Sequence, residues 1–166
     1  YVTHDKDKAF AMADKIVFMD HGDVVQSGAP ETLFRAPANE LVARSLGMRN
    51  ILPGTIAKRD AGAQVECSVG TLQVEAPGMD DGDDALVLID ERGVTVLSTP
   101  GDVTPAGALA GVVKSRDFRG GESELRVSVG DGELVCVVAG RDAGSKVQPG
   151  DSVGVFVPTS AVRLLR

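Results

Sequence analysis

GDDALVLIDERGVTVL at Gly82–Leu97 and GDSVGVFVPTSAVRLL at Gly150–Leu165 align with each other without a gap. Upstream of them, GTIAKRD at Gly54–Asp60 resembles GVVKSRD at Gly111–Asp117, and the second copy carries a longer insertion before its closing strand. Two copies of one β unit, each of roughly 50 residues, are the simplest explanation of this pattern. The sequence therefore predicts a duplicated β fold.

Apolar residues alternate with polar ones between these anchors, which indicates an all-β region after Asn50. The predicted strands are Gln64–Val69, Leu72–Glu75, Ala85–Ile89, Leu125–Val129, Leu134–Val138 and Val153–Val157. Clusters of Gly, Pro and Asp separate them, as is typical of a small barrel or sandwich. We expect repeats at about 51–100 and 108–166, joined by the Pro-, Gly- and Ala-rich connector Pro100–Ala110.

The first 50 residues have a mixed α and β pattern instead. The predicted elements are a helix over Asp5–Asp14, strands at Ile16–Met19 and Val24–Gln26, and helices over Glu31–Arg35 and Glu40–Leu46. Asp5 and Asn39 are residue types that cap helices, and Pro30 suits a first helical turn. Gly22 supplies the positive φ of a tight hairpin, and Gly47 ends the last helix. The fold class is therefore mainly β with a small α/β segment at the N-terminus.

Composition and charge exclude several classes of protein. A chain of 166 residues with 43% hydrophobic side chains can bury a core. No run approaches the ~18 apolar residues of a membrane span, and no secretory leader is recognisable, so the sequence reads as cytosolic. The net charge of -7 repels phosphate backbones, and 4% aromatic residues with no Trp are too few for base stacking. We expect no nucleic-acid partner.

Potential metal ligands have simpler explanations. Cys67 and Cys136 each lie in an alternating apolar stretch, where a free Cys usually behaves as a small buried hydrophobe. A disulfide or a metal pair is the less favoured alternative. The acidic run Asp80–Asp84 could bind a cation, but such runs are more often solvated loops between strands. His21 reads as a solvated turn residue, and capping and turn chemistry explain the neighbouring acids. We therefore predict no metal site.

The order and spacing of the N-terminal motifs resemble the C-terminal end of the nucleotide-binding subunit of an ABC importer. The matching motifs are Thr3-His4-Asp5, Ala11-Met12-Ala13-Asp14, Ile16–Met19, Val24–Glu31, Pro37–Asn39 and Val42–Gly47. The residues after Asn50 resemble the regulatory extension of this family, a tandem OB-like β barrel called the transport-associated OB (TOBE) domain. Within the family, Gly47–Gly54 (GMRNILPG) is most similar to importers of ferric iron, polyamines or related small solutes.

The resemblance implies a function. Residues 1–50 would be the end of the ATP-hydrolysing domain, and residues 51–166 would be a TOBE-like regulatory domain. His4 would be the switch histidine that contacts the γ-phosphate and the attacking water during phosphoryl transfer. ATP and Mg²⁺ would be cofactors of the full-length subunit. Its partners would be transmembrane permease subunits and a solute-binding protein, on the cytoplasmic side of the inner (plasma) membrane.

The catalytic core of that family is absent from the sequence. There is no G-x-x-x-x-G-K-[ST] loop, no ABC signature segment and no strand that ends in an Asp-Glu pair. We therefore expect these 166 residues to be inactive alone and to hold no cofactor, His4 being the one cofactor contact. Ala29 stands where relatives commonly have Thr or Ser, which removes a helix cap worth ~0.5 to 2 kcal/mol. Asp90-Glu91-Arg92 replaces a common Arg-Pro-Glu segment, so the contacts of that segment are not carried over.

Two expectations concern assembly and binding. Short strands leave open edges that proteins pair or cover, so we expect a homodimer through the β region, with Asp117–Val138 long enough to reach a partner. The alternative, from another class, is a stand-alone binding module for small oxyanions, because similar domains bind them. Titration with molybdate, sulfate and phosphate would separate these two hypotheses.

Overall fold

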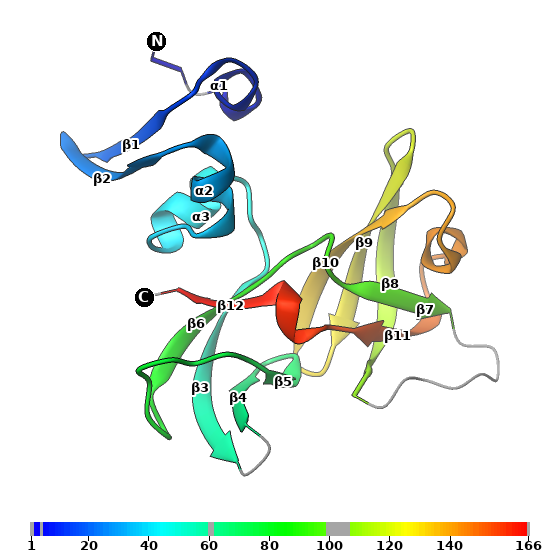
Figure 1. Ribbon diagram of the computed structural model, residues 1–166. Helices are drawn as coiled ribbons and strands as arrows, with labels where there is room; N and C mark the ends of the chain where they lie inside the picture. Colours follow the sequence, from blue (N-terminus) through cyan, green and yellow to red (C-terminus); the bar gives the residue numbers. More distant parts are fainter. Residues whose placement is uncertain (1, 4, 60–61, 99–106, 166) are drawn as a thin grey trace. The chain divides into compact units, whose positions relative to one another are not determined.

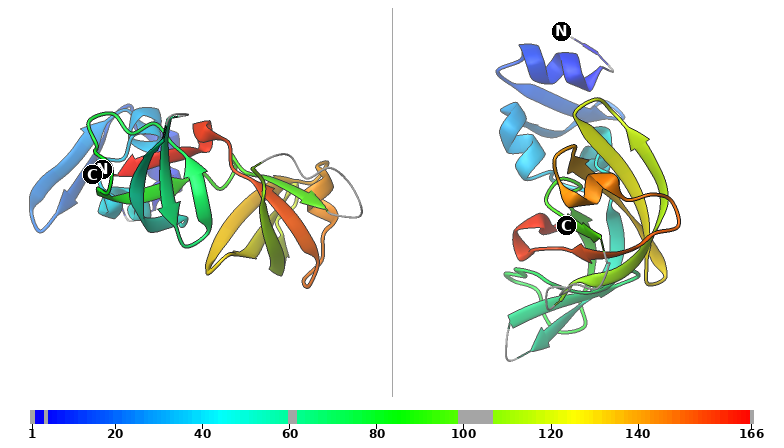
Figure 2. Two further views of the ribbon diagram at one scale, coloured as in Figure 1. Left: turned by 90° about the horizontal axis from the view of Figure 1, so that it is seen from below. Right: turned by 90° about the vertical axis from the view of Figure 1, so that its right-hand side faces the viewer.

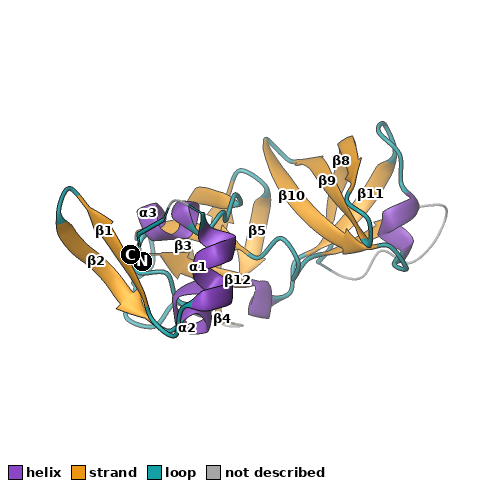
Figure 3. Cartoon of the chain, turned by 90° about the horizontal axis from the view of Figure 1, so that it is seen from above, coloured by secondary structure: helices purple, strands orange, loops and turns teal. Residues whose placement is uncertain are grey.

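The computed structural model describes residues 2–3, 5–59, 62–98 and 107–165 of the chain. Strands predominate and the helices are short, which confirms the mainly β prediction (Figure 3). The chain divides into two compact units, one of residues 1–49 with 165–166 and one of residues 50–164. The predicted seam at Pro100–Ala110 lies mostly outside the described residues.

The N-terminal unit contains the five predicted elements. They are α1 (Lys6–Met12), β1 (Ile16–Asp20), β2 (Asp23–Gly28), α2 (Pro30–Arg35) and α3 (Glu40–Ser45). Both predicted caps form: the side chain of Asp5 accepts from the Lys8 N–H at 3.1 Å, and that of Asn39 accepts from the Val42 N–H at 3.0 Å. The β1–β2 turn has a positive φ at Gly22, as predicted, and also at the preceding His21.

Helix α2 begins without a side-chain cap, as its sequence predicts. Ala29 occupies the cap position and makes no side-chain hydrogen bond. Gln26 of β2 stabilises the segment after this helix instead. Its amide donates to the Ala36 carbonyl and accepts from the Ala38 N–H, both at 2.8 Å. One side chain therefore joins the hairpin to the α2–α3 connection.

The larger unit consists of ten strands and two short 3₁₀ helices (Figure 1). The strands are β3 (Ile51–Arg59), β4 (Gly62–Cys67), β5 (Gly70–Gln73), β6 (Asp84–Ile89), β7 (Thr95–Ser98), β8 (Leu109–Phe118), β9 (Glu122–Val129), β10 (Gly132–Ala139), β11 (Ser152–Phe156) and β12 (Val162–Leu165). The 3₁₀ helices are η1 (Ala143–Lys146) and η2 (Thr159–Ala161). All six predicted strands are present. Strands β3, β7, β8 and β12 were not predicted, although the repeat anchors contain them.

The ten strands form two antiparallel five-stranded sheets that exchange their closing strands. The first sheet has the order β12-β6-β3-β4-β5 and the second has the order β10-β9-β8-β11-β7. The final strand of the first repeat, β7, pairs with β11 of the second, while β12 joins the sheet of β6. Figure 1 shows this exchange, with red β12 beside green β6, and Figure 2 shows the two sheets from other directions. Neither repeat completes its sheet alone.

The two repeats have the same close atomic contacts at one pair of equivalent glycines. Gly54 on β3 and Gly111 on β8 occupy equivalent positions. A Cβ added at either glycine would lie 2.7 Å from a valine methyl group and 2.9 Å from a backbone carbonyl oxygen. The contacted residues are Val65 and Glu66 in the first repeat and Val127 and Ser128 in the second. Only glycine allows these strands to approach so closely.

Candidate functional site

The described residues do not include His4, so its switch role stays a prediction. Its neighbours have local roles: the Asp5 N–H donates to Thr3 Oγ1 at 2.9 Å, and Asp5 caps α1. The side chain of His21 is 94% exposed, and its Nε2 lies 3.8 Å from Asp20 Oδ1. His21 is therefore a solvated turn residue, as the sequence indicates.

The acidic run Asp80–Asp84 makes hydrogen bonds and an ion pair that stabilise the loop before β6. Lys58 Nζ lies 3.1 Å from Asp80 Oδ1, and the Lys58 N–H donates to Asp81 Oδ1 at 2.7 Å. Asp83 accepts from the Asp80 N–H at 2.6 Å. Within the described part of the chain, no three His, Cys, Asp or Glu residues gather closely enough to hold a metal ion. The described residues of this acidic run therefore do not fit a Mg²⁺ site.

Both cysteines are free thiols. Cys136 on β10 is fully buried, and burial, followed by the charge of Glu91, raises the pKa of its thiol to about 12. Cys67 is half-buried and donates to the Gly70 carbonyl at 3.3 Å; burial raises its pKa as well. A thiol with a raised pKa is a poor nucleophile and a poor metal ligand at neutral pH. These residues belong to the core.

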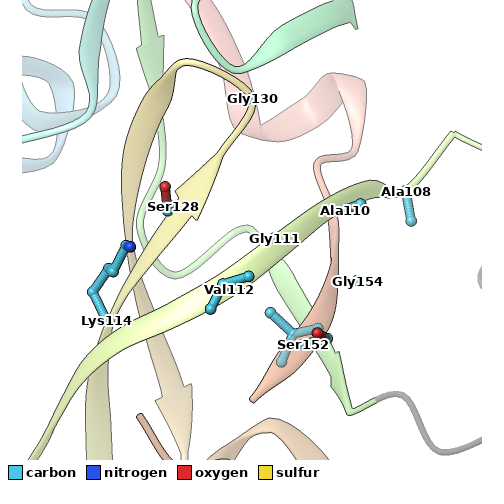
Figure 4. Close-up of a pocket in the computed structure, with 10 residues that line it drawn as sticks. Ala108, Ala110, Gly111, Val112, Lys114, Ser128, Gly130, Ser152 and Gly154 are labelled. Atoms are coloured by element: carbon cyan, nitrogen blue, oxygen red, sulfur yellow. The ribbon is translucent and has the colours of Figure 1, made fainter. Parts of the chain in front are cut away.

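A cavity of about 500 Å³ lies on the second sheet, over β8, β9 and β11 (Figure 4). Its lining residues are Ala108, Ala110, Gly111, Val112, Lys114, Ser128, Gly130, Ser152, Val153 and Gly154. Lys114 is the one ionisable side chain among them, and Ser128 and Ser152 contribute hydroxyl groups from the neighbouring strands. Small residues therefore leave a hollow, and its polar lining can donate hydrogen bonds.

A β-bulge places Lys114 at this cavity. Val113 pairs with Val127 and Ser115 pairs with Arg126, so Lys114 has no cross-strand partner between them. Bulges often re-aim a side chain beside a functional site. The sequence comparison did not detect the bulge, because it aligned Lys114 directly with Ala57. In the alignment of Gly82–Leu97 with Gly150–Leu165, Ser152 of the second repeat stands at the position of Asp84 in the first. This difference is the sequence signal that could have identified the cavity.

Asn50 is a second residue whose role the sequence did not predict. It is 2% exposed, and its side-chain amide makes two hydrogen bonds to the backbone of Val135, both 2.8 Å long. The Val137 N–H donates to the Glu91 carbonyl at 2.8 Å. Together these bonds pair the outer edge of β10, which would otherwise be an open sheet edge.

Comparison with known proteins shows which domain family and which proteins the chain resembles. Residues 93–165 match the TOBE domain family. The chain is 35% identical over 172 residues to the Fe(3+) ions import ATP-binding protein FbpC of Streptomyces avermitilis, covering 99% of this chain and 44% of that protein. It is 34% identical over 137 residues to the spermidine/putrescine import ATP-binding protein PotA of Clostridium novyi, covering 80% and 36%. The chain thus contains a TOBE domain, and it matches the C-terminal regions of ABC importer ATP-binding proteins.

The chain spans less than half the length of these relatives. A solved structure with a similar fold is that of the cytoplasmic molybdate-binding protein ModG with molybdate bound. It has a TM-score of 0.58 and 19% identity, covering 70% of this chain and 94% of that one. At this identity the likeness shows the fold alone. In the described part of the chain, no helix is both long and apolar enough to cross a membrane.

Proposed function

We propose that the chain is the C-terminal part of the ATP-hydrolysing subunit of an ABC-type importer. Residues 1–50 end the nucleotide-binding domain, and residues 51–166 form a tandem OB-like TOBE domain that serves regulation and dimerisation. The observation that supports this proposal is the similarity to FbpC of S. avermitilis, which extends over 99% of the chain and therefore includes both parts.

In the full-length subunit, His4 is the switch residue for ATP and its Mg²⁺, which the absent core would bind. The subunit lies on the cytoplasmic side of the inner membrane with permease subunits and a solute-binding protein. The solute is ferric iron, a polyamine or another small solute. The names of the similar proteins, which import Fe(3+) ions or spermidine and putrescine, support this choice.

The test is His4→Ala in the full-length protein. The turnover of ATP should fall by ~10²-fold or more while nucleotide binding is largely kept, because the lost contact is made chiefly in the transition state. His21→Ala is the matched control, since that side chain is solvated. An unchanged rate constant for His4→Ala would contradict the switch role. The 166-residue chain alone should show no ATP turnover.

The dimer is tested on the chain itself. Light scattering should give twice the chain mass of 17.2 kDa if the β domain is sufficient for dimerisation. A mass of one chain at ~100 µM would contradict the dimerisation role. A dimer that dissociates at this concentration is held no more tightly than an encounter complex. The regulatory role would then stand alone.

A second candidate function is a stand-alone binding module for small oxyanions. Two observations favour it: the fold likeness to a molybdate-binding protein, and the cavity that Lys114, Ser128 and Ser152 line. Calorimetric titration of the chain with molybdate, sulfate and phosphate tests it. Heat of binding at micromolar concentration supports this candidate, and its absence for all three ions contradicts it.

A further inference from the structure

In the described part of the chain, residues 115–118 of β8 have no strand on their outer side. Strand β11 pairs with residues 109–112, and its approach ends where the Val113 N–H donates to the Asp151 carbonyl at 3.0 Å. Beyond this point β8 continues to pair with β9 on its other side. Figure 1 shows the β8–β9 hairpin extending past the end of β11. This open segment, residues 115–118, is called the β8 edge below, and an open edge is a template for an extended chain.

Within the described residues, the unpaired backbone groups of the β8 edge are those of Arg116 and Phe118. The Arg119 N–H donates to the Glu122 carbonyl at 2.8 Å, which marks a hydrogen-bonded pair of the β8–β9 ladder. Such pairs alternate along an antiparallel ladder, so Asp117 also bonds to β9, whereas Arg116 and Phe118 direct their backbone groups away from it. The edge therefore offers N–H donors and carbonyl acceptors to an added strand.

The equivalent edge of the first repeat is covered by an acid. There the Lys58 N–H of β3 donates to the carboxylate of Asp81 at 2.7 Å. Asp81 directly precedes the aligned segment of the first repeat, and Pro149 stands at the same place in the second. A proline side chain cannot accept a hydrogen bond. The second repeat therefore lacks the side chain that covers this edge in the first.

The arginine of the β8 edge lacks the acid that its counterpart uses. Arg59 of the first repeat aligns with Arg116, and its Nη2 lies 3.5 Å from Glu66 Oε1. By strand register, Ser128 occupies the position of Glu66 in the second sheet. The bulge of β8 also turns Arg116 to the face of its cross-strand partner Leu125, which is fully buried. Among the described residues, the buried Nε of Arg116 has no hydrogen-bond partner.

The acids of the hairpin do not replace the missing one. The side chain of Glu124 is 7% exposed, and its Oε2 lies 3.2 Å from Arg119 Nη2. Asp117 is adjacent to Arg116 in the strand, so its side chain points to the opposite face of the sheet. Phe118 lies on the same face as Arg116 and is 66% exposed. This face therefore presents a half-buried cation, which an external carboxylate would compensate, beside an exposed aromatic ring.

From these observations we infer that the β8 edge binds an acidic peptide segment of another protein as an added β-strand. The backbone of the segment pairs with Arg116 and Phe118. A carboxylate of the segment pairs with the Arg116 guanidinium, and an apolar side chain two residues away contacts the Phe118 ring. The segment thus supplies the acids that the first repeat takes from its own Asp81 and Glu66. This interaction goes beyond the proposed transporter role and does not depend on it.

Charge favours such a partner over a second copy of this chain. Two β8 edges that pair about a two-fold axis centred on this segment place two Arg116 side chains, or two Asp117 side chains, directly opposite each other. Like charges in directly opposite positions destabilise a strand pair. An acidic segment has no such conflict at Arg116.

The experiment is an NMR titration of the whole isotope-labelled chain with the blocked peptide Thr-Val-Thr-Glu-Thr-Val. Its valines lie two residues to either side of Glu, so the peptide fits both strand directions. The amide signals of Arg116 and Phe118 should shift until they saturate. The same peptide with Gln in place of Glu should bind about tenfold more weakly, because it loses a charge-assisted hydrogen bond. A peptide that is N-methylated at Glu should also bind about tenfold more weakly or not at all, because it cannot donate to the Arg116 carbonyl.

A variant of the protein separates the ion pair from the backbone pairing. Arg116→Gln should weaken the Glu peptide by about tenfold and leave the affinity of the Gln peptide unchanged within about twofold. Arg59→Gln is the matched control, because it removes the same charge at the equivalent position of the first repeat and should change either affinity less than about twofold.

Four results would overturn the inference. They are no shift of the Arg116 and Phe118 signals at ~1 mM peptide, equal effects of the two arginine variants, full affinity of the N-methylated peptide, and shifts of these signals with protein concentration alone. The last result would assign the β8 edge to a second copy of the chain. The transporter proposal would stand in each case, because it rests on other observations.

Discussion

Gly93 and Ala161 occupy the same position in the two repeats and contact each other. A Cβ added at Gly93 would lie 2.7 Å from the Cβ of Ala161, and the Asp90 N–H donates to the Ala161 carbonyl at 2.8 Å beside them. Equivalent residues that touch must lie near the axis that relates the two copies. One of the pair has to be glycine, because two methyl groups cannot occupy this space.

The first prediction follows from this contact. Gly93→Ala should lower the free energy of unfolding by ~1–3 kcal/mol, because the new methyl group overpacks a rigid backbone region. The exchanged pair, Gly93→Ala with Ala161→Gly, should recover at least half of the loss. Urea unfolding followed by circular dichroism measures both. If Gly93→Ala unfolds with the wild-type midpoint, the contact is not tight.

The second prediction uses the equivalent glycines. Gly54→Ala and Gly111→Ala should each destabilise the protein by ~1–3 kcal/mol and by similar amounts, because each Cβ would meet a backbone carbonyl oxygen that cannot move alone. Gly121→Ala is the control, since a Cβ there has nothing within 4 Å. Thermal unfolding ranks the three variants. Losses at Gly54 and Gly111 no larger than at Gly121 would contradict the equivalence of the repeats.

Local chemistry made the N-terminal elements and six of the strands predictable. Helix caps and turn glycines act on residues only a few positions away, as Asp5, Asn39 and Gly22 do. Their effects can therefore be predicted from the local sequence alone. Strand β3 was missed because Pro53 and Gly54 interrupt its alternation near the start. The exchange of β7 and β12 could not be predicted, because it depends on which sheet offers a free edge, which is a property of the assembled repeats.

The candidate site was less predictable than the fold. The cavity depends on a bulge at Lys114 and on cross-strand rows that bring Ser128 and Ser152 beside Val112. A register shift of one residue has no signature in a single sequence, since both registers keep the same residues. The duplication offered a partial signal, because Asp84 aligns with Ser152. Without the strand register, however, the difference between Asp84 and Ser152 indicates only a change on the protein surface, with no sign of a cavity.

The third prediction concerns Asn50. Asn50→Asp should lower the free energy of unfolding at neutral pH by ~1–3 kcal/mol or more, because a buried carboxylate cannot donate to the Val135 carbonyl. Burial raises the pKa of an acid, so part of this loss should be recovered near pH ~4, where the neutral carboxyl group can donate again. The measured quantity is the difference from the wild type at each pH. A difference that does not change with pH would contradict the two-bond geometry.

The fourth prediction concerns the thiol of Cys136, whose pKa burial raises from 9.0 to about 12. Below the pKa of the unfolded chain, both states keep the proton and stability does not depend on this group. As pH rises from about 9 toward the folded value, the unfolded thiol ionises first, so the free energy of unfolding should fall by up to ~1.4 kcal/mol per pH unit. Cys136→Ala should lose this part of the slope, whatever its cavity costs at neutral pH, because the two proteins differ only at this thiol. Urea unfolding at several values between about pH 8 and 11 measures the two slopes, with Cys67→Ala as a control for a half-buried thiol. Parallel slopes for the wild type and Cys136→Ala would show that water reaches this thiol in the folded state.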